Sequence, residues 1–538
     1  MNKKAWQSLL AVLVALTLWM GPFQYLSGVQ ARPSAGEFYV DQNNPLANDA
    51  NNGSQAAPWL TIQHAAEVAG PGDTVYVKSG FYPERVVPKA SGASGQMIAF
   101  KALPRRSVTM YGFYTVNSDY LRIEGFNVTT DDSLTGWTEG YGVFIHSNHV
   151  EVVDNYFYDL KSTAIQGYWH EPFPEAAYVA DNTIYHSQMG IGITGFNWLV
   201  ENNEVERLYN YGGGDSDYSR FFGEGHRIIG NYFHGTNFNE IGSAHVDCFQ
   251  TFDNNGEYVH NILFDGNRCS DFHQGFMGEA AYYGNSSDVV FQNNIFEHGL
   301  AWGLCVYQIR NITVLHNTFV DIQYHAIGLQ DGASGSVQNN IFYNAGSNYW
   351  ADQGGSVSGS HNLLYRTSGS IDPASYPDDL VNLDPQFLDV NNGDYHLQSG
   401  SPAINTGLDA GVTTDRDGMP RPQGGGFDIG AYEFAPALSL RGMPADSKIS
   451  LDWTVNAALP LTTTWQISYE GPAGDQASPI TGLPAETRAF ELSGLTNYTW
   501  YTVTLQAMLG EDIYLTDTLK SMPSDHLQFI PLVRKATP

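Results

Sequence analysis

Cysteine is scarce in this sequence of 538 residues, which contains only Cys248, Cys269 and Cys305. So small and odd a number in a large chain excludes the disulfide-framework class, and at most one intramolecular bridge can form. No set of cysteines and histidines has the spacing of a zinc site. The fold must therefore be stabilised by a packed core.

Basic residues are also few: 25 Lys and Arg stand against 56 Asp and Glu, which gives a formal net charge of −31. A surface of this sign repels nucleic acid and anionic membranes, so we expect no nucleic-acid partner. An acidic polymer could be bound only where a local basic patch or a bound cation bridges the two negative charges.

Long apolar runs are confined to the N-terminus. Two lysines precede an apolar stretch from Leu9 to Met20, and Val29-Gln30-Ala31 offers small residues for cleavage. Residues 1–31 are therefore predicted to be a signal peptide, and the mature protein to be secreted and extracellular, either free or attached to the cell surface. No later stretch approaches the roughly 20 apolar residues of a membrane span, so no integral membrane segment is expected.

An internal repeat is the strongest pattern in the chain. Eight asparagines, 21 to 36 residues apart, each follow an apolar residue by three positions and precede an apolar residue or cysteine by two. They are Asn155, Asn182, Asn203, Asn231, Asn267, Asn294, Asn317 and Asn340. Asparagine tolerates a left-handed turn and can stack on its copy one coil away. This period predicts an all-β protein whose main body, over residues 103–360, is a right-handed parallel β-helix, a solenoid.

Two other solenoids have comparable periods. A leucine-rich repeat needs a leucine-dominated consensus that is absent here, and helical repeats do not fit strands rich in β-branched and aromatic residues. Residues 32–102 are predicted to be the N-terminal cap and first coils, with a short helix over Thr61–Ala69 and a buried strand over Thr74–Val77.

Four segments of this N-terminal region carry a resemblance. They are Phe38-Tyr39-Val40-Asp41, Pro58-Trp59-Leu60-Thr61-Ile62-Gln63-His64-Ala65, Pro71-Gly72-Asp73-Thr74-Val75 and Gly80-Phe81-Tyr82-Pro83-Glu84. Together with the repeats, residues 37–434 resemble secreted β-helix proteins of the pectate-lyase-like superfamily. The resemblance implies the fold, whereas the activity stays open, because the superfamily contains lyases, hydrolases, epimerases and non-enzymes.

Residues 361–434 leave the repeat and resemble a tail module found behind many bacterial β-helices, which implies that they close its C-terminal end. Residues 437–523 have longer alternating strands and predict a small β-sandwich. This segment resembles a fibronectin type III domain, with Trp453 as its core tryptophan and Tyr501 as its corner tyrosine. Residues 524–538 form a tail, and we expect the whole protein to be a monomer.

Two neighbouring coils are interrupted by inserted loops. Asp217 follows Asn203 by 14 residues and Asp247 follows Asn231 by 16, whereas about eight separate the asparagine from the next strand elsewhere. Aligning the two coils stacks Asp217 on Asp247 and Arg220 on Gln250, at the roughly 4.8 Å spacing of adjacent coils. Stacked carboxylates repel, so one takes a proton or a cation lies between them.

The surrounding polar residues complete the predicted site. The catalytic candidates are Asp217, Asp247, His245, Arg220 and His226. The candidate Ca²⁺ ligands are Asp215, Asp217, Glu224 and Asp247. The candidate substrate-binding residues are Gln250, His273, Gln274 and Glu279, with Trp302 and Tyr307 as sugar-stacking platforms. A simpler interpretation is that both aspartates are turn residues that bind backbone amides, with the histidines on a solvated face.

Three functions remain open, each with an extracellular polysaccharide as partner. The resemblance favours a lyase of uronate-containing, pectin-like glycans, in which calcium bridges the uronate and Arg220, His226 or His245 removes a proton. A lysine base is doubtful, because Lys161 is the only lysine between Lys101 and Lys448. The alternatives are a glycoside hydrolase with a carboxylate pair acting on a neutral glycan, and a non-catalytic glycan-binding adhesion protein.

Overall fold

The computed structural model describes residues 35–131, 140–211, 214–252, 258–280, 285–371, 376–457, 459, 462–471 and 479–525. The predicted signal peptide and residues 526–538 of the predicted tail lie outside this range, so secretion stays a prediction. In the described ranges, no helix is both long and apolar enough to span a membrane.

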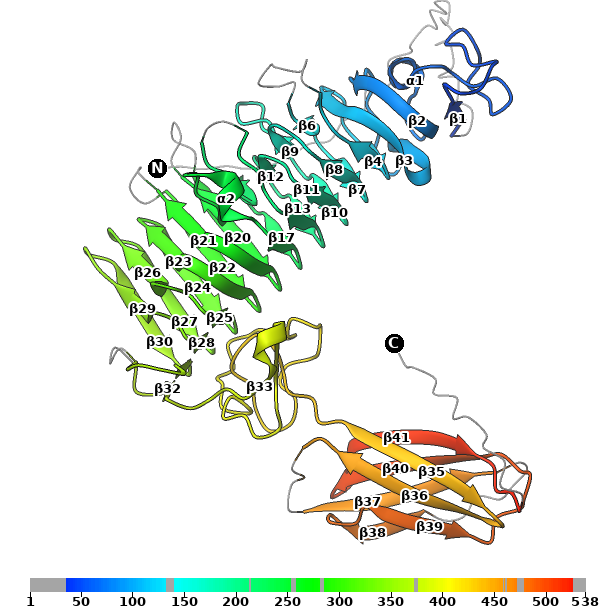
Figure 1. Cartoon of the computed structure of the whole chain (residues 1–538), viewed down its shortest axis with the longest axis vertical. Coiled ribbons are helices and arrows are strands. Elements are labelled where there is room, and N and C mark those ends of the chain that lie inside the picture. The colour runs from blue at the N-terminus through cyan, green and yellow to red at the C-terminus, as the bar shows by residue number, and fades with distance from the viewer. Residues whose placement is uncertain are drawn as a thin grey trace, which may run out of the picture.

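The chain is an all-β protein in which a right-handed parallel β-helix is followed by a β-sandwich (Figure 1). The solenoid begins with β1 (Glu37–Val40), α1 (Ile62–Val68), β2 (Thr74–Val86) and β3 (Ile98–Val116). Both predicted N-terminal elements are confirmed. The hydroxyl of Thr61 caps α1 by accepting a hydrogen bond from the His64 N–H, and β2 starts at Thr74.

Every pairing from β1 to β32 is parallel and joins a strand to its counterpart one coil further on. The strands form three sheets along the solenoid. The first sheet contains β4 (Leu121–Glu124), β7 (Val150–Val153), β10 (Tyr178–Ala180), β13 (Leu199–Glu201), β17 (Arg227–Ile229), β20 (Val259–Asp265), β22 (Ser287–Gln292), β24 (Arg310–Leu315), β27 (Ser334–Gln338) and β30 (Ser356–Ser360). β16 (Gly223–Glu224) also pairs with β20.

The second sheet follows the asparagine turn, and the third lies after the next turn. The second contains β5 (Asn127–Val128), β8 (Tyr156–Tyr158), β11 (Thr183–Tyr185), β14 (Glu204–Glu206), β18 (Tyr232–His234), the first parts of β21 (Arg268–Glu279) and β23 (Ile295–Tyr307), β25 (Thr318–Val320), β28 (Ile341–Tyr343), β31 (Leu363–Tyr365) and β32 (Leu380–Val381). The third contains β6 (Val143–His146), β9 (Thr163–Gly167), β12 (Met189–Ile193), β15 (Ser219–Phe221), β19 (Asp247–Thr251), the last parts of β21 and β23, β26 (His325–Gln330) and β29 (Ser347–Ala351).

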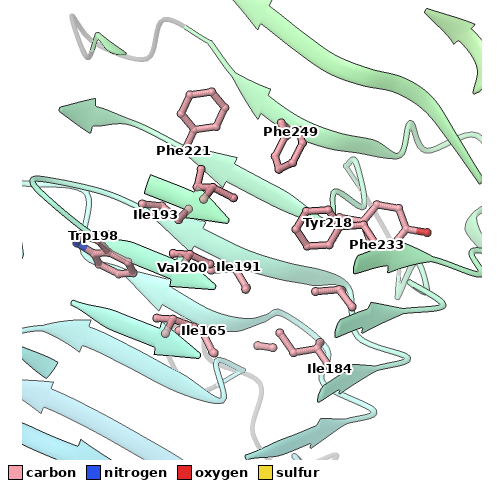
Figure 2. Close-up of a cluster of buried hydrophobic side chains, with 14 of the residues drawn as sticks. Ile165, Ile184, Ile191, Ile193, Trp198, Val200, Tyr218, Phe221, Phe233 and Phe249 are labelled. Carbon is pink, nitrogen blue, oxygen red and sulfur yellow. The ribbon is translucent and has the colours of Figure 1, made fainter. Parts of the chain in front are cut away.

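Inward-facing side chains of all three sheets fill the solenoid as one continuous apolar core (Figure 2). Like residues stack along the axis: the rings of Phe264 and Phe291 lie 4.6 Å apart at 5°, and those of Phe296 and Phe319 lie 5.1 Å apart at 11°. Because each coil buries its apolar face against the next, the core grows with the number of coils.

The asparagine ladder is buried inside the turn. Asn182 Nδ2 donates to Asn203 Oδ1 at 2.9 Å, and Asn203 Nδ2 donates to Asn231 Oδ1 at 2.9 Å. The predicted stacking is confirmed, but the predicted left-handed backbone is not at the asparagine. That conformation belongs to the preceding residue, such as Asp181 with φ 56° or Asn202 with φ 54°. The ladder asparagine can therefore point inward while its predecessor makes the turn.

The segment after the last coils lies along the side of the solenoid. Side chains between Phe387 and Tyr432 form one buried cluster with Ile295, Val320, Ile341 and Leu363 from four successive coils of the second sheet. This segment includes β33 (Phe387–Asp389), the short 3₁₀ helix Val390–Asn392 and β34 (Asp394–Leu397). The predicted closing role belongs to the residues just before this segment: Tyr376 stacks on Tyr349 of the last coils at 5.4 Å, and Asp379 accepts from Asn362 at the end of the ladder. Residues 387–432 lie over the outer side of the second sheet.

The C-terminal β-sandwich is confirmed. One antiparallel sheet contains β35 (Leu438–Ala445), β36 (Lys448–Val455) and β39 (Ala489–Ser493), and the other contains β38 (Ile480–Pro484), β37 (Thr463–Glu470), β40 (Tyr501–Leu509) and β41 (Asp512–Ser521). Trp453 packs against Trp465 in the core, and the Tyr501 hydroxyl accepts a hydrogen bond from the Thr496 N–H at 3.0 Å. The likeness to fibronectin type III stays a prediction.

Candidate functional site

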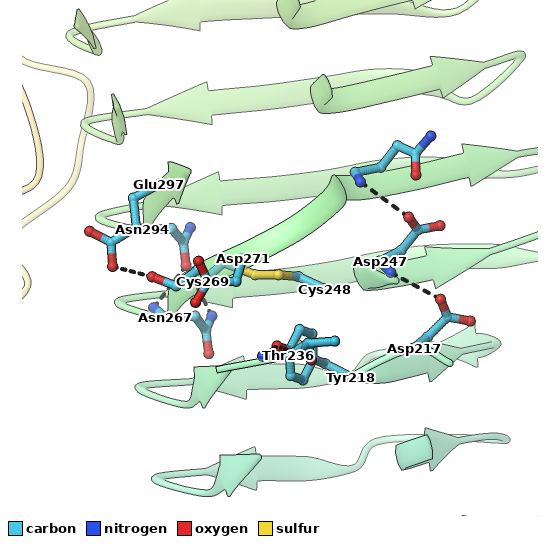
Figure 3. Close-up of a disulfide and its surroundings, with 12 residues drawn as sticks. Asp217, Tyr218, Thr236, Asp247, Cys248, Asn267, Cys269, Asp271, Asn294 and Glu297 are labelled. Carbon is cyan, nitrogen blue, oxygen red and sulfur yellow. Dashed lines mark hydrogen bonds between the residues drawn. A yellow bond between two sulfur atoms is a disulfide. The ribbon is translucent and has the colours of Figure 1, made fainter. Parts of the chain in front are cut away.

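The predicted alignment of the two interrupted coils is confirmed. Arg220 pairs with Gln250 between β15 and β19, and the Tyr218 N–H donates to the carbonyl of Asp247 at 2.9 Å. Asp217 and Asp247 therefore occupy the same position in neighbouring coils, where the chain enters the third sheet (Figure 3).

Asp217 is fully buried and both of its carboxylate oxygens are engaged. Oδ1 accepts from the Asp247 N–H at 3.0 Å, and Oδ2 accepts from Arg220 Nε at 2.6 Å. Burial raises the pKa of Asp217 to about 6, although the Arg220 charge and these hydrogen bonds oppose that rise. Asp217 therefore orients Arg220.

Asp247 is the carboxyl group that most favours a proton. It is 1% exposed, and burial together with the charge of Asp217 raises its pKa well above the ordinary value. Asp247 Oδ1 accepts from the Gln274 N–H at 3.2 Å, and Oδ2 lies 3.3 Å from Gln250 Nε2. Gln250 Oε1 is buried without a hydrogen-bond partner. If the Gln250 side-chain amide is rotated by 180°, Oε1 takes the place of Nε2 and can accept a hydrogen bond from a protonated Asp247 Oδ2.

Both aspartates also match the simpler interpretation, since each binds a backbone amide of the next coil. What distinguishes them from ordinary turn residues is the second oxygen, which holds Arg220 in one coil and Gln250 in the next. Two buried carboxyl groups with raised pKa values on adjacent coils are costly for stability, and such arrangements cluster at functional sites.

The inserted loops make a shallow pocket beside these carboxyl groups. Its volume is about 610 Å³, and it is lined by Asn210, Gly214 and Asp215 from one loop and by residues 239–244 from the other. The second loop contains the one-turn helix α2 (Phe238–Ile241). Asp215 links the pocket to the cluster, because its carboxylate lies 3.6 Å from Arg220 Nη2 and 3.4 Å from the His245 N–H.

Two histidines complete the pocket side of the site. The rings of His245 and His273 are 5.3 Å apart, and His273 Nδ1 accepts from the Val246 N–H at 3.1 Å. Burial and the neighbouring His245 lower the pKa of His273, which favours the neutral form of its imidazole. His245 is exposed. The structure thus brings together Asp215, Asp217, Arg220, His245 and Asp247, with Gln250, His273 and Gln274 around them.

Two predicted residues lie elsewhere. His226 is fully buried, its Nδ1 accepts from the Trp198 N–H at 3.2 Å, and its Nε2 lies 3.0 Å from the Phe222 carbonyl. Burial lowers its pKa to about 4, so its predicted catalytic role is wrong and it is a core histidine. Glu224 lies in β16 and pairs with His260 of β20, away from the third sheet. Turns of unequal length moved both residues off the predicted face.

The four predicted calcium ligands do not form one compact set. Arg220 lies between Asp215 and Asp217, where a cation was expected, and Glu224 is on another strand. Within the described part of the chain, the group whose ligand atoms all lie within 4.8 Å of one another is Glu204, Glu206 and His234, on the second sheet. This group was not predicted from the sequence, although the ladder register places Glu206 beside His234. Whether calcium binds anywhere stays a prediction.

The predicted substrate-binding residues further along share the same sheet. Gln274 pairs with Trp302, and Glu279 pairs with Tyr307. Trp302 in turn pairs with His325 of β26, a residue that was not selected from the sequence. Gln274, Glu279, Trp302 and Tyr307 thus all lie in the third sheet, and their substrate-binding roles stay predictions.

One disulfide lies next to the carboxyl groups. Cys248, directly after Asp247, bonds to Cys269 across the inside of the same region of the solenoid (Figure 3). Cys305 is buried and free. The single bridge agrees with the cysteine count, and it ties the entry of β19 to β21 in the second sheet.

Comparison with known proteins supports the fold. The family model described as "Right handed beta helix region" matches residues 240–368. The chain is similar to an uncharacterised protein, YwoF, of Bacillus subtilis (strain 168), with 27% identity over 141 residues. That match covers 24% of this chain and 30% of YwoF, so the chain spans less than a third of this relative's length.

Solved structures with similar folds are distant in sequence. XylC in complex with xylose has 11% identity and a TM-score of 0.45, covering 74% of this chain and 98% of XylC. A rhamnogalacturonan lyase has 14% identity and a TM-score of 0.36, covering 66% and 92%. The periplasmic alginate epimerase AlgG has 10% identity and a TM-score of 0.36, covering 59% and 78%.

Proposed function

We propose that this chain is a polysaccharide-active enzyme, and that its glycan lies along the outer face of the third sheet beside the pocket. The observation that carries the proposal is the buried carboxyl group of Asp247, whose pKa is raised well above its ordinary value by burial and by Asp217. A carboxyl group with a raised pKa keeps its proton to a higher pH than an ordinary carboxyl group, and it can act as a general acid towards a glycosidic oxygen.

Hydrolysis of a neutral glycan agrees best with the charges of the site. Arg220 is already held by Asp217 and Asp215, and Arg207 by Glu240 of the pocket lining, so little positive charge remains to attract a uronate. This balance favours the carboxylate-pair hydrolase over the calcium-assisted lyase. The −31 net charge of the chain points the same way.

Each residue of the proposed hydrolase has one role. Asp247 gives its proton to the leaving glycosidic oxygen as the C–O bond breaks, after Gln250 has moved from Oδ2. Asp215, whose side chain is 41% exposed at the pocket, accepts the proton of the water that attacks the anomeric carbon. Asp217 keeps Asp247 protonated through its negative charge and orients Arg220, which can donate to sugar hydroxyls.

A lyase is the second candidate, and it is favoured by the exposed His245, whose backbone N–H lies 3.4 Å from Asp215, the carboxylate next to Arg220. In that reaction an imidazole takes the proton next to a uronate carboxylate held by Arg220, a C=C bond forms, and the C–O bond to the leaving oxygen breaks. That oxygen takes the Asp247 proton. Reaction at a uronate would make calcium useful as a bridging cation.

The test is incubation of the purified protein with neutral and uronate-containing polysaccharides, with chelator and with added calcium. Hydrolysis predicts new reducing ends on a neutral polymer without near-ultraviolet absorbance, unaffected by chelator. An unsaturated product that absorbs in the near ultraviolet, formed from a uronate polymer, would show that the protein is a lyase. If chelator prevents formation of that product, the predicted requirement for calcium would be supported. If the protein binds a glycan and forms neither product, the non-catalytic adhesion function would be supported.

A further inference from the structure

An aromatic cluster lies on the third sheet, in line with the carboxyl groups. Along one column of paired residues, Asp247 is followed by Gln274, Trp302 and His325, one in each successive coil. Trp350 follows one coil later, beside Gly328. The rings of Trp302 and His325 are 4.3 Å apart, those of His325 and Trp350 5.2 Å, and those of Trp302 and Trp350 5.8 Å.

The Trp302 ring lies against the sheet because Gly328 leaves room for it. A Cβ atom at Gly328 would come within 2.3 Å of Trp302 Cζ3, so the indole ring rests directly on the backbone of the next coil. Trp302, His325 and Trp350 are all partly exposed, which leaves part of their surfaces open. The rings are tilted by 45° to 67° to one another, so they form an angled aromatic surface, which on rigid strands needs no ordering when a ligand binds.

The cluster also has an unused polar group. Trp350 Nε1 is buried and has no hydrogen-bond acceptor among the described residues. This nitrogen is covered, so a ligand meets the open faces of the rings, which suit a molecule with both C–H faces and hydroxyl groups. A sugar has that combination. Nucleic acid, which also stacks on aromatic rings, is disfavoured by the net charge of −31.

We propose that Trp302, His325 and Trp350 form a distal sugar-binding subsite for the glycan that the carboxyl site acts on. This inference rests on the proposed function. Trp302 is two coils from Asp247 and Trp350 is four, which places them roughly 10 Å and 19 Å away along the solenoid axis. The rise of one coil is close to the length of one sugar unit in an extended chain. The subsite therefore selects glycans of about four or more units.

The test compares binding of long and short oligosaccharides to Trp302→Ala and Trp350→Ala. Both substitutions are made in an Asp247→Asn chain, so that binding is measured without cleavage. The probes are hexasaccharides and disaccharides of cellulose, xylan, mannan and polygalacturonate, measured by calorimetry. Each tryptophan variant should weaken hexasaccharide binding by about tenfold and leave disaccharide binding unchanged.

Two controls separate the subsite from damage to the fold. Trp500→Ala removes a tryptophan that is 54% exposed on the β-sandwich and should change nothing. Trp302→Phe keeps a ring and should restore most of the hexasaccharide affinity, and melting temperatures identify any misfolded variant.

The subsite and the hydrolase can fail separately. Hexasaccharide binding that is unchanged in both alanine variants, or no binding of any probe by the parent chain, overturns the subsite. Binding that depends on these tryptophans, in a protein that cleaves none of the polymers, supports the subsite and overturns the proposed hydrolase instead.

Discussion

The carboxylate of Asp217 accepts a hydrogen bond from the backbone N–H of Asp247 at 3.0 Å, one coil further along the solenoid. This contact is a consequence of the stacked register, and it brings two carboxyl groups together inside the protein. Since two buried negative charges repel, the pair retains a proton at a pH where ordinary carboxyl groups have lost theirs.

The first prediction concerns stability against pH. The folded pKa values of Asp217, about 6, and of Asp247 lie above the unfolded value, so the folded state binds protons more tightly than the unfolded chain. The contribution of the pair to stability is therefore fully present below about pH 4 and is lost as the pH rises through 6. Asp247→Asn should raise the melting temperature at pH 8 by a few degrees and change it little at pH 4.5. Calorimetry at the two pH values measures this, and an equal loss at both would show that the carboxylate is a structural turn residue.

The second prediction concerns the disulfide. Cys248 and Cys269 close a loop of 21 residues beside Asp247, so replacing both with alanine should reduce the free energy of unfolding by about 2–4 kcal/mol. Cys305→Ala, which removes a buried thiol without a bridge, is the matched control. Denaturation with and without reductant distinguishes them: reductant should destabilise the parent chain and the Cys305 variant, but not the double variant. A parent chain indifferent to reductant would argue against the bridge.

Much of this molecule could be predicted because the asparagine ladder leaves a fixed pattern in the sequence. Once Asn203 and Asn231 are aligned, the stacking of Asp217 on Asp247 follows from counting. Counting failed for Glu224 and His226, because the turn after β15 carries them towards the first sheet. The repeat pattern also does not predict which candidate side chains are buried, because the inserted loops determine which of them are exposed to solvent.

The longer-range features had no local signal. Residues 387–432 pack against outward-facing apolar residues of the second sheet, such as Ile295 and Ile341. In the sequence, these two positions do not differ from outward-facing strand positions that stay uncovered. The register pairs Glu206 with His234, but neither residue falls in an inserted loop, so the loop pattern gives no signal for this group.

The third prediction tests the ladder. Asn231 Oδ1 accepts two hydrogen bonds from Asn203, and its Nδ2 donates to Asn267 Oδ1 at 2.9 Å, all in the buried turn. Asn231→Ala leaves these groups without partners and should cost about 2–4 kcal/mol of unfolding free energy. Asn239→Ala, at an exposed position of α2, should cost far less. Equal effects in urea denaturation would mean that the ladder does not stabilise the solenoid.

The last prediction separates the roles of the three carboxylates. Asp247→Asn removes the proposed acid and should lower kcat by about 10²–10⁴-fold with the fold intact. Asp215→Asn should lower kcat comparably if it is the base, because it faces the pocket, whereas Asp452→Asn, an exposed aspartate of the β-sandwich, should leave kcat unchanged. Asp217→Asn removes the charge that raises the pKa of Asp247, so the decline of activity on the alkaline side should move to lower pH. Steady-state rates between pH 4 and 9 on the polymer that is cleaved measure all four variants. If the pH profile of Asp217→Asn is the same as that of the parent chain, or if Asp247→Asn is fully active, the general acid must be another residue of the pocket.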